Sequence, residues 1–336
     1  MLPRPKNVFT QVDVCGSSLP VSEVTLDLEE FTQGRLSTVP AVKGPDEQVC
    51  TEKEKALFRS AVGDLHWVSS QSRPDCAVYA SRLQKVQNHP TLGDYRELAR
   101  VLRELRDTAG DVLKIKAIED PVDAVWTDSS LFGAQGEQMP DDFAVPKEER
   151  QNFHSQGGYL VALIPRGQLQ AQTASTDISI LDWKTRASKR VLHSTFAAEA
   201  TTALEAVGHA RCIRVYLAEI LFRGNARRVD VQTLDEESVF GTVCFADCKS
   251  LFDNVLKDAS VPSDKLVAIS VACLRGVASA GPQRDLSRTE LRWLPTRWQL
   301  ADALTRIGLG KLLRIRMAAS QTCLFELSAA AVRKQK

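Results

Sequence analysis

The sequence predicts an α/β fold built on one mixed sheet, preceded by a small all-helical unit. Between residues 53 and 108 apolar residues recur at helical spacing. Beyond Gly110, short apolar runs typical of buried strands alternate with helical stretches. The chain has 336 residues, and at roughly 150 residues per domain this length suggests two domains. The helical part and the α/β part are therefore expected to be separate domains.

The helical unit is expected at residues 53–118, after an irregular lead-in at residues 1–52 that has little periodicity. Asp75 is expected to cap the second helix of the unit, which follows a break at Arg73-Pro74. The third helix has one apolar face, whose members are spaced by three, four and three residues: Tyr95, Leu98, Leu102 and Leu105.

The α/β domain is expected at residues 119–315, with a C-terminal tail at 316–336. Five apolar runs predict its strands: 122–128, 157–164, 178–183, 243–247 and 291–294. A long helix is expected to begin at Ser194 and to reach about Phe222, with an apolar stripe along it. Further helices are expected at 248–257, at 263–279 and after Pro295. The predicted order is three strands, a long helix, and then strands that alternate with helices. This order is typical of an α/β domain with one mixed sheet.

Composition narrows the functional classes. Lys and Arg number 43 and Asp and Glu number 42, giving a net charge of +1, which excludes a uniformly basic nucleic-acid-binding chain but not separate charged regions. Apolar runs fall short of the roughly 18–20 residues that span a bilayer, and the N-terminus lacks a secretory pattern. We therefore expect an intracellular protein, cytoplasmic or nuclear, without a membrane partner. Its eight scattered cysteines are typical of free thiols.

Four carboxylates occupy positions at which active sites of α/β sheets are built. Asp128 and Asp247 end two of the predicted strands, Glu199 lies one turn into the long helix, and Asp302 lies near the start of the last helix. Taken singly, each residue is more often a turn, cap or solvated residue. Together they would repel one another unless cations neutralised them, and oxygen ligands of this kind suit Mg²⁺ or Mn²⁺.

Local motifs strengthen this hypothesis. The stretches Leu57–Leu65 (LFRSAVGDL), Ser72–Ala77 (SRPDCA) and Tyr95–Leu105 (YRELARVLREL) resemble the segment that follows the polymerase palm in copia-type LTR retrotransposon Pol polyproteins. The second half resembles the ribonuclease H domain of the same family at five places: Val125–Ser130 (VWTDSS), Ile180–Arg186 (ILDWKTR), His193–Ala200 (HSTFAAEA), Phe245–Leu251 (FADCKSL) and Leu294–Thr305 (LPTRWQLADALT). The last of these is the most specific.

The resemblance implies a ribonuclease H-like, five-stranded mixed sheet and hydrolysis of the RNA strand of RNA–DNA hybrids. It implies two Mg²⁺ ions, with Mn²⁺ as the alternative. Asp128, Glu199 and Asp247 would bind one ion, and Asp128 with Asp302 would bind the other. Two such ions activate a water and stabilise the leaving oxygen of a phosphodiester.

The resemblance also implies that the helical unit is the end of a reverse transcriptase, similar to its thumb and connection. The palm and fingers would then lie upstream in a longer polyprotein, as a partner of this chain. The aromatic-x-Asp-Asp signature of a polymerase is absent, because Asp141-Asp142 lies in a polar loop. No polymerase activity is expected from this chain alone.

Two groups of basic residues are candidates for binding nucleic-acid phosphates. The first is expected on the loop that leads into the Glu199 helix: Lys184, Arg186, Lys189 and Arg190. The second forms a stripe on one helix at spacings of four and three: Arg96, Arg100 and Arg103. A solvated basic surface is an equally good interpretation of either group.

Two other functions remain open. The first is a catalytically inactive retroelement remnant that acts as a nucleic-acid or protein binding module. The second is a related polynucleotidyl transferase such as an integrase core, although the helical unit upstream argues against it. The presence of all four acids, Asp128, Glu199, Asp247 and Asp302, favours an active nuclease, because a decayed copy has no reason to retain them together.

Overall fold

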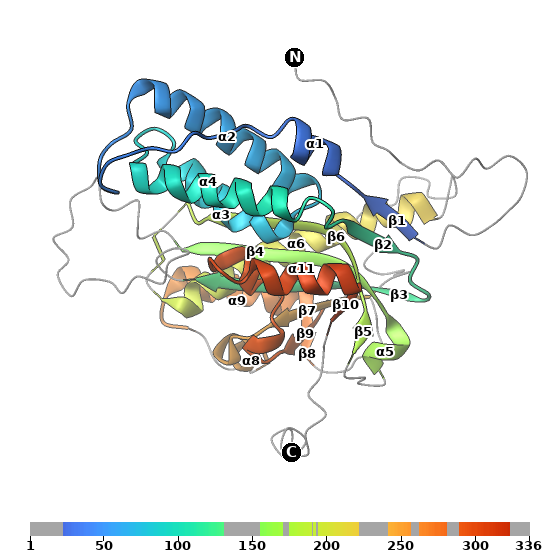
Figure 1. Ribbon diagram of the computed structural model, residues 1–336. Helices are drawn as coiled ribbons and strands as arrows, with labels where there is room; N and C mark the ends of the chain where they lie inside the picture. The colour runs from blue at the N-terminus through green and yellow to red at the C-terminus, as the bar shows by residue number, and fades with distance from the viewer. Residues whose placement is uncertain are drawn as a thin grey trace, which may run out of the picture. The chain divides into compact units, whose positions relative to one another are not determined.

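The structure is a computed structural model of the chain (Figure 1). It describes these residues: 23–130, 155–170, 175–189, 191–192, 194–221, 241–256, 262–280 and 289–322. The chain divides into two units, which are described separately. Unit 1 combines Met1–Ala117 with Gly310–Ser320, and unit 2 combines Ile118–Leu309 with Gln321–Lys336.

Unit 1 contains the helical region that the sequence predicts. Its helices are α2 (Glu52–Gln71), η1 (Pro74–Cys76), α3 (Ala77–Val86) and α4 (Leu92–Asp107). Thr51 and Thr91 each form a capping box with an acid three residues later, which fixes where α2 and α4 begin. The predicted apolar face of α4 is buried, as the helical spacing requires.

Asp75 does not cap α3 as the sequence predicts. It lies within η1, and the N-cap of α3 is Cys76, which makes no side-chain cap hydrogen bond. The Asp75 carboxylate instead accepts two hydrogen bonds from the buried guanidinium of Arg73, at 2.9 and 2.8 Å. A charged partner two residues away competes successfully with a neutral backbone N–H for this carboxylate.

Unit 1 also contains elements for which the sequence has no local signal. Strand β1 (Glu23–Leu26) pairs antiparallel with β2 (Leu113–Lys116), and α1 (Glu29–Gly34) follows β1, although an irregular segment is expected there. Helix α11 (Gly310–Ala319) packs on η1, whereas the sequence suggests that residues up to 315 belong to the α/β domain. The backbones of α11 and η1 approach closely at Gly310. A glycine is required there, because a Cβ on Gly310 would lie 2.4 Å from the Asp75 carbonyl oxygen.

Unit 2 is built on a six-stranded mixed sheet with the order β6-β4-β3-β7-β9-β8 (Figure 1). Its strands are β3 (Pro121–Ser130), β4 (Gln156–Pro165), β6 (Ser179–Ala187), β7 (Thr242–Ala246), β8 (Ala278–Ala280) and β9 (Thr289–Trp293). The first three strands of the order are antiparallel and the others pair in parallel. All five predicted strands are present, and β8 adds a three-residue edge strand too short to show periodicity.

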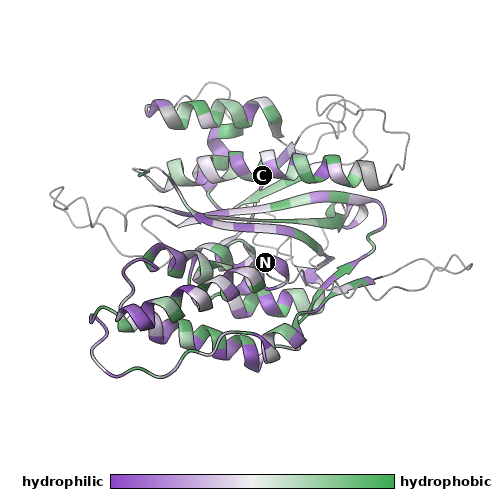
Figure 2. Cartoon of the chain, turned by 90° about the horizontal axis from the view of Figure 1, so that it is seen from above, coloured by the Kyte–Doolittle hydropathy of each residue, from purple (hydrophilic) through white to green (hydrophobic). Residues whose placement is uncertain are grey.

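Helices α6 (Thr195–Leu221), α8 (Lys249–Leu256) and α9 (Lys265–Val277) contribute to one apolar core with residues of β3, β4, β7 and β9. Figure 2 shows apolar and hydrophilic residues interspersed along the helices, as amphipathic helices require. The remaining short elements of unit 2 are α5 (Arg166–Gln170), β5 (Thr176–Asp177), η3 (Thr296–Trp298), α10 (Asp302–Thr305) and β10 (Gln321–Thr322). The predicted fold class, a mixed sheet with flanking helices preceded by a helical unit, is confirmed.

No helix within the described ranges is both long enough and apolar enough to cross a membrane.

A buried carboxyl of β3 makes the stability of unit 2 depend on pH. Asp123 is fully buried, and this burial raises its pKa from 3.8 to about 7, although Arg214 and the Thr242 hydroxyl act in the opposite direction. The folded chain therefore holds the proton more tightly than the unfolded chain does. Stability from this group is present at pH values below 3.8 and is lost as the pH rises to about 7.

We expect Asp123→Asn to stabilise the protein relative to the parent by roughly 1–3 kcal/mol at pH 8 and by less at pH 5, because an amide cannot ionise. Urea denaturation of both chains at the two pH values measures this difference. Glu119→Gln, at an exposed carboxyl, is the control and should show no such pH dependence. An equal effect of Asp123→Asn at both pH values would contradict the prediction.

Candidate active site

The edge of the sheet at which β3 and β7 end brings the four predicted acids to one region. Thr127 of β3 pairs in parallel with Ala246 of β7, so Asp128 and Asp247 follow adjacent positions. Glu199 is the fifth residue of α6 and Asp302 is the first residue of α10. Each acid is thus positioned by the start of a helix or by the end of a strand.

Three of the four acids form a close cluster. Carboxylate oxygens of Asp128, Asp247 and Asp302 all lie within 4.8 Å of one another. Glu199 stands beside this cluster, and its Oε1 accepts a hydrogen bond from the backbone N–H of Ser129 at 3.1 Å. The negative charges of Asp128 and Asp247 both act on Glu199.

Burial and mutual repulsion disfavour the charged forms of Asp128, Glu199 and Asp302. Burial raises the pKa of Asp128, raises that of Asp302 to about 7, and raises that of Glu199 well above its usual range. Neighbouring carboxylates of the cluster add to each of these shifts. Acids whose pKa values are raised in this way are common at functional sites.

The donor set fits a divalent cation. Glu199 Oε2 and Asp302 Oδ1 are buried, and neither forms a hydrogen bond within the described part of the chain. The guanidinium of Arg306 reaches Asp302 Oδ1 only at 3.8 Å. Buried carboxylate oxygens without hydrogen bonds are unfavourable unless a cation compensates them, and carboxylate oxygens are the ligands of Mg²⁺ and Mn²⁺.

The segment 293–305 supplies side chains that hold the acids, and two of them, Thr296 and Thr305, have no individual signal in the sequence. The Thr305 hydroxyl donates to Asp128 Oδ2, and the Thr296 hydroxyl donates to Asp247 Oδ2 at 2.8 Å. Trp293 Nε1 donates to the carbonyl oxygen of Asp247 at 2.9 Å. These residues lie in or next to the Leu294–Thr305 motif, which is the feature of the sequence that points to them.

Gly158 makes room for α10 beside the acids. It is paired with Asp128 across β3 and β4, and a Cβ there would lie 2.6 Å from Leu304 Cβ and 3.0 Å from Thr305 Cγ2. We expect Gly158→Ala to displace α10 and to cost roughly 1–3 kcal/mol of stability. Gly208→Ala is the control, because nothing lies within 4 Å of a Cβ there. Chemical denaturation of both variants measures the difference, and equal stability of the two would contradict the prediction.

The first basic group lies partly on a strand, not on the predicted loop. Strand β6 continues to Ala187, so Lys184 and Arg186 belong to it and project from the same side. The apolar pattern ends at Trp183 because the rest of this edge strand has polar side chains. Lys189 follows the strand and is exposed, and Arg190 lies outside the described residues.

The second basic group is partly occupied by contacts within unit 1. Arg96 pairs with Asp46 and donates to the Gly44 carbonyl oxygen. Arg100 lies 3.4 Å from Glu104 and over the ring of Tyr79. Arg103 is exposed and makes no ion pair with the described residues. The three arginines therefore lie on one helix, α4, and among them only Arg103 makes no ion pair with the part of the chain that the structure describes.

No protein-family model matches the chain. No curated protein matches it. Three solved structures are similar to it over 55–64% of its length.

RNase H1 from the halophilic archaeon Halobacterium salinarum NRC-1 is 12% identical, with a TM-score of 0.30 and 93% of that chain covered. The N-terminal RNase H domain of a Mycobacterium tuberculosis protein is 11% identical, with a TM-score of 0.28 and 96% covered. LC9-RNase H1, a type 1 RNase H with the type 2 active-site motif, is 16% identical, with a TM-score of 0.27 and 92% covered.

Proposed function

We propose that the chain is a metal-dependent endonuclease that hydrolyses the RNA strand of RNA–DNA hybrids. The observation that carries the proposal is the cluster of Asp128, Asp247 and Asp302, with Glu199 beside it, at the edge of a mixed sheet. An acidic cluster of this kind, whose members are largely buried and lack enough internal donors, fits divalent cations. The predicted assignment is that Asp128, Glu199 and Asp247 bind one ion and that Asp128 and Asp302 bind the other.

Bound Mg²⁺, or Mn²⁺ in its place, would activate a water and stabilise the charge that develops on the leaving 3′ oxygen. The protein's part is to hold the ligands in place. The hydroxyls of Thr305 and Thr296 orient Asp128 and Asp247, and the Ser129 backbone orients Glu199. Positioning of this kind matters because small displacements of catalytic groups greatly reduce rates.

We further propose that the chain is the ribonuclease H portion of a copia-type retrotransposon polyprotein. The support is the resemblance of the Leu57–Leu65 and Leu294–Thr305 motifs, together with a helical unit before the sheet. The partners on this proposal are an RNA–DNA hybrid and the palm and fingers of a reverse transcriptase encoded upstream.

The test is a cleavage assay of the purified full chain. End-labelled RNA–DNA hybrid is incubated with Mg²⁺, with Mn²⁺ or with a chelator, beside double-stranded RNA and double-stranded DNA. We expect cleavage of the RNA strand of the hybrid only, and only with a divalent cation. Absence of cleavage together with tight hybrid binding would contradict the enzyme proposal and favour the binding-module alternative. Equal cleavage of all duplexes would contradict the hybrid preference.

A further inference from the structure

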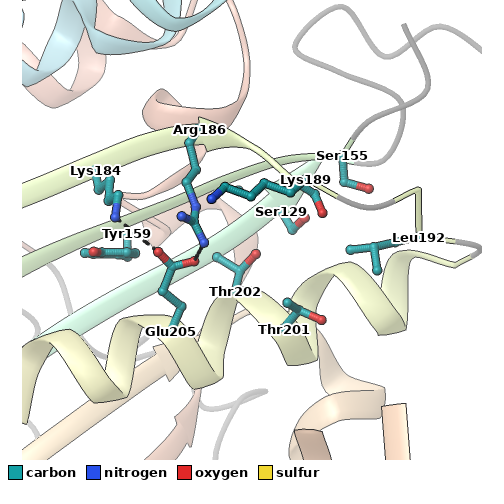
Figure 3. A pocket seen from close by; sticks show the side chains of 12 residues that line it. Ser129, Ser155, Tyr159, Lys184, Arg186, Lys189, Leu192, Thr201, Thr202 and Glu205 are labelled. Atoms are coloured by element: carbon teal, nitrogen blue, oxygen red, sulfur yellow. Dashed lines mark hydrogen bonds and ion pairs between the residues drawn. The ribbon is translucent and has the colours of Figure 1, made fainter. Parts of the chain in front are cut away.

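A pocket separate from the carboxylate cluster lies between strands β4 and β6 and helix α6. Its volume is about 210 Å³, and its walls include Ser129, Ser155 and Tyr159 on the sheet side. Figure 3 shows Lys184, Arg186 and Lys189 along the same pocket, with Glu205 rising from α6. We call this the β6–α6 pocket.

The β6–α6 pocket lies next to the carboxylate cluster, because Ser129 in its wall directly follows Asp128 in β3. Because side chains alternate along a strand, Ser129 and Asp128 project to opposite faces of β3. Asp128 contacts Thr305 of α10, whereas Ser129 lines the pocket with Thr201 and Thr202 of α6. A nucleic-acid strand bound at the acids would therefore pass close to the pocket without sharing its ligands.

Three hydroxyl groups of the pocket have no hydrogen-bond partner among the described residues. The side chains of Ser129, Ser155 and Tyr159 belong to residues that are only 5%, 1% and 3% exposed. Their oxygens are buried, and none forms a side-chain hydrogen bond within the described residues. Buried hydroxyls are normally paired, so three unpaired ones around a cavity indicate a ligand with several hydrogen-bond acceptors.

The charged side chains that line the pocket carry a net positive charge, which favours binding of an anion. Lys184 Nζ lies 3.2 Å from Glu205 Oε1, and Arg186 pairs with the other oxygen of Glu205. Lys189 makes no ion pair with any described residue, so the three cations exceed the single carboxylate by two charges. Both ion pairs are half exposed to solvent, where such pairs are weak and an incoming anion can replace the carboxylate.

We propose that the β6–α6 pocket binds a backbone phosphodiester of the nucleic acid, and that Glu205 occupies its cations when no nucleic acid is bound. Phosphate oxygens are acceptors only, which suits a site made of hydroxyl donors, an ammonium and a guanidinium. The biological role of the pocket rests on the proposed nuclease function. The binding step does not, because it requires neither the metal nor cleavage.

The test measures binding of a fluorescent RNA–DNA hybrid by anisotropy, with a chelator present and over a series of KCl concentrations. Lys189→Gln and Arg186→Gln should each weaken binding by about three- to tenfold and lower the salt slope by about one. Glu205→Gln should strengthen binding by about threefold or more, because it releases two cations. A variant that merely damages the structure would weaken binding, so the opposite sign for Glu205→Gln is diagnostic.

Lys265→Gln is the matched control, because Lys265 is an exposed lysine at the start of α9 and does not line the pocket. It should change binding less than the pocket variants do. Weaker or unchanged binding by Glu205→Gln, or pocket variants that match Lys265→Gln, would overturn the proposal. The cleavage assay of the parent chain with Mg²⁺ is scored separately, so a failure of the nuclease proposal is distinguishable from a failure of the pocket.

Discussion

Asp128→Asn is expected to reduce metal-dependent hybrid cleavage by at least about 100-fold and to make the metal-free protein more stable. Both effects follow from the same property of the site. Asp128 is almost completely buried beside other carboxylates, so its charge is unfavourable until a cation binds. An amide of the same shape removes the repulsion but is a much poorer ligand for Mg²⁺.

Thermal melting of the parent and of Asp128→Asn, with and without Mg²⁺, tests the predicted effect on stability. A ligand at 100 times its Kd stabilises a folded protein by about 2.7 kcal/mol, so the parent should melt at a higher temperature with Mg²⁺ and Asp128→Asn should respond much less. Asp123→Asn is the matched control, because Asp123 is a buried aspartate of the same strand that lies outside the cluster. Equal loss of cleavage in the two variants would contradict the assignment of the site.

Arg73→Met is expected to destabilise unit 1 by roughly 3–5 kcal/mol, because it leaves the buried charge of Asp75 without its main partner. Arg73 donates to both oxygens of Asp75 and also to the carbonyl and hydroxyl oxygens of Thr108. After the substitution, the remaining cation near Asp75 among the described residues is Arg314, at 3.5 Å. The side chains of Arg73 and Asp75 are 3% and 2% exposed, so water cannot replace the lost contact.

Urea denaturation of the full chain measures this loss. The double variant Arg73→Met with Asp75→Leu should regain part of the stability, because the unpaired charge is then absent. Arg59→Met is the control at an exposed arginine of α2, which binds Gln87 and Asn88, and it should cost less than about 1 kcal/mol. A cost for Arg73→Met as small as that of Arg59→Met would refute the proposed role of the buried pair.

The elements that the sequence predicts are those encoded by local periodicity. The apolar face of α4 and the five apolar runs of the sheet are examples, because a buried face imposes a repeat on consecutive residues. The approach of Asp128 and Asp247 is also foreseeable, since ends of parallel strands meet at one edge. The sequence predicts a loop for Lys184 and Arg186 because an edge strand with polar side chains lacks the apolar signal.

The parts that sequence reasoning missed depend on residues far apart in the chain. Thr305 is 177 residues from Asp128, and β1 pairs with β2 some ninety positions later. No spacing rule connects such residues, because folding alone brings them together. Local competition explains the other miss, since Arg73 binds the carboxylate of Asp75 in place of the expected helix cap.

Helix α11 belongs to unit 1 although it follows most of unit 2 in the sequence, and this affects both the synthesis and the proteolysis of the protein. Unit 1 lacks its last helix until residue 320 has been synthesised, after nearly the whole of unit 2. Arg314 of that helix binds Asp75, Glu104 and Asp111, so a fragment ending at residue 117 would leave these three acids without it. The backbone passes from one unit to the other near residues 117, 309 and 320, and a single proteolytic cut therefore cannot separate an intact unit 2 from unit 1.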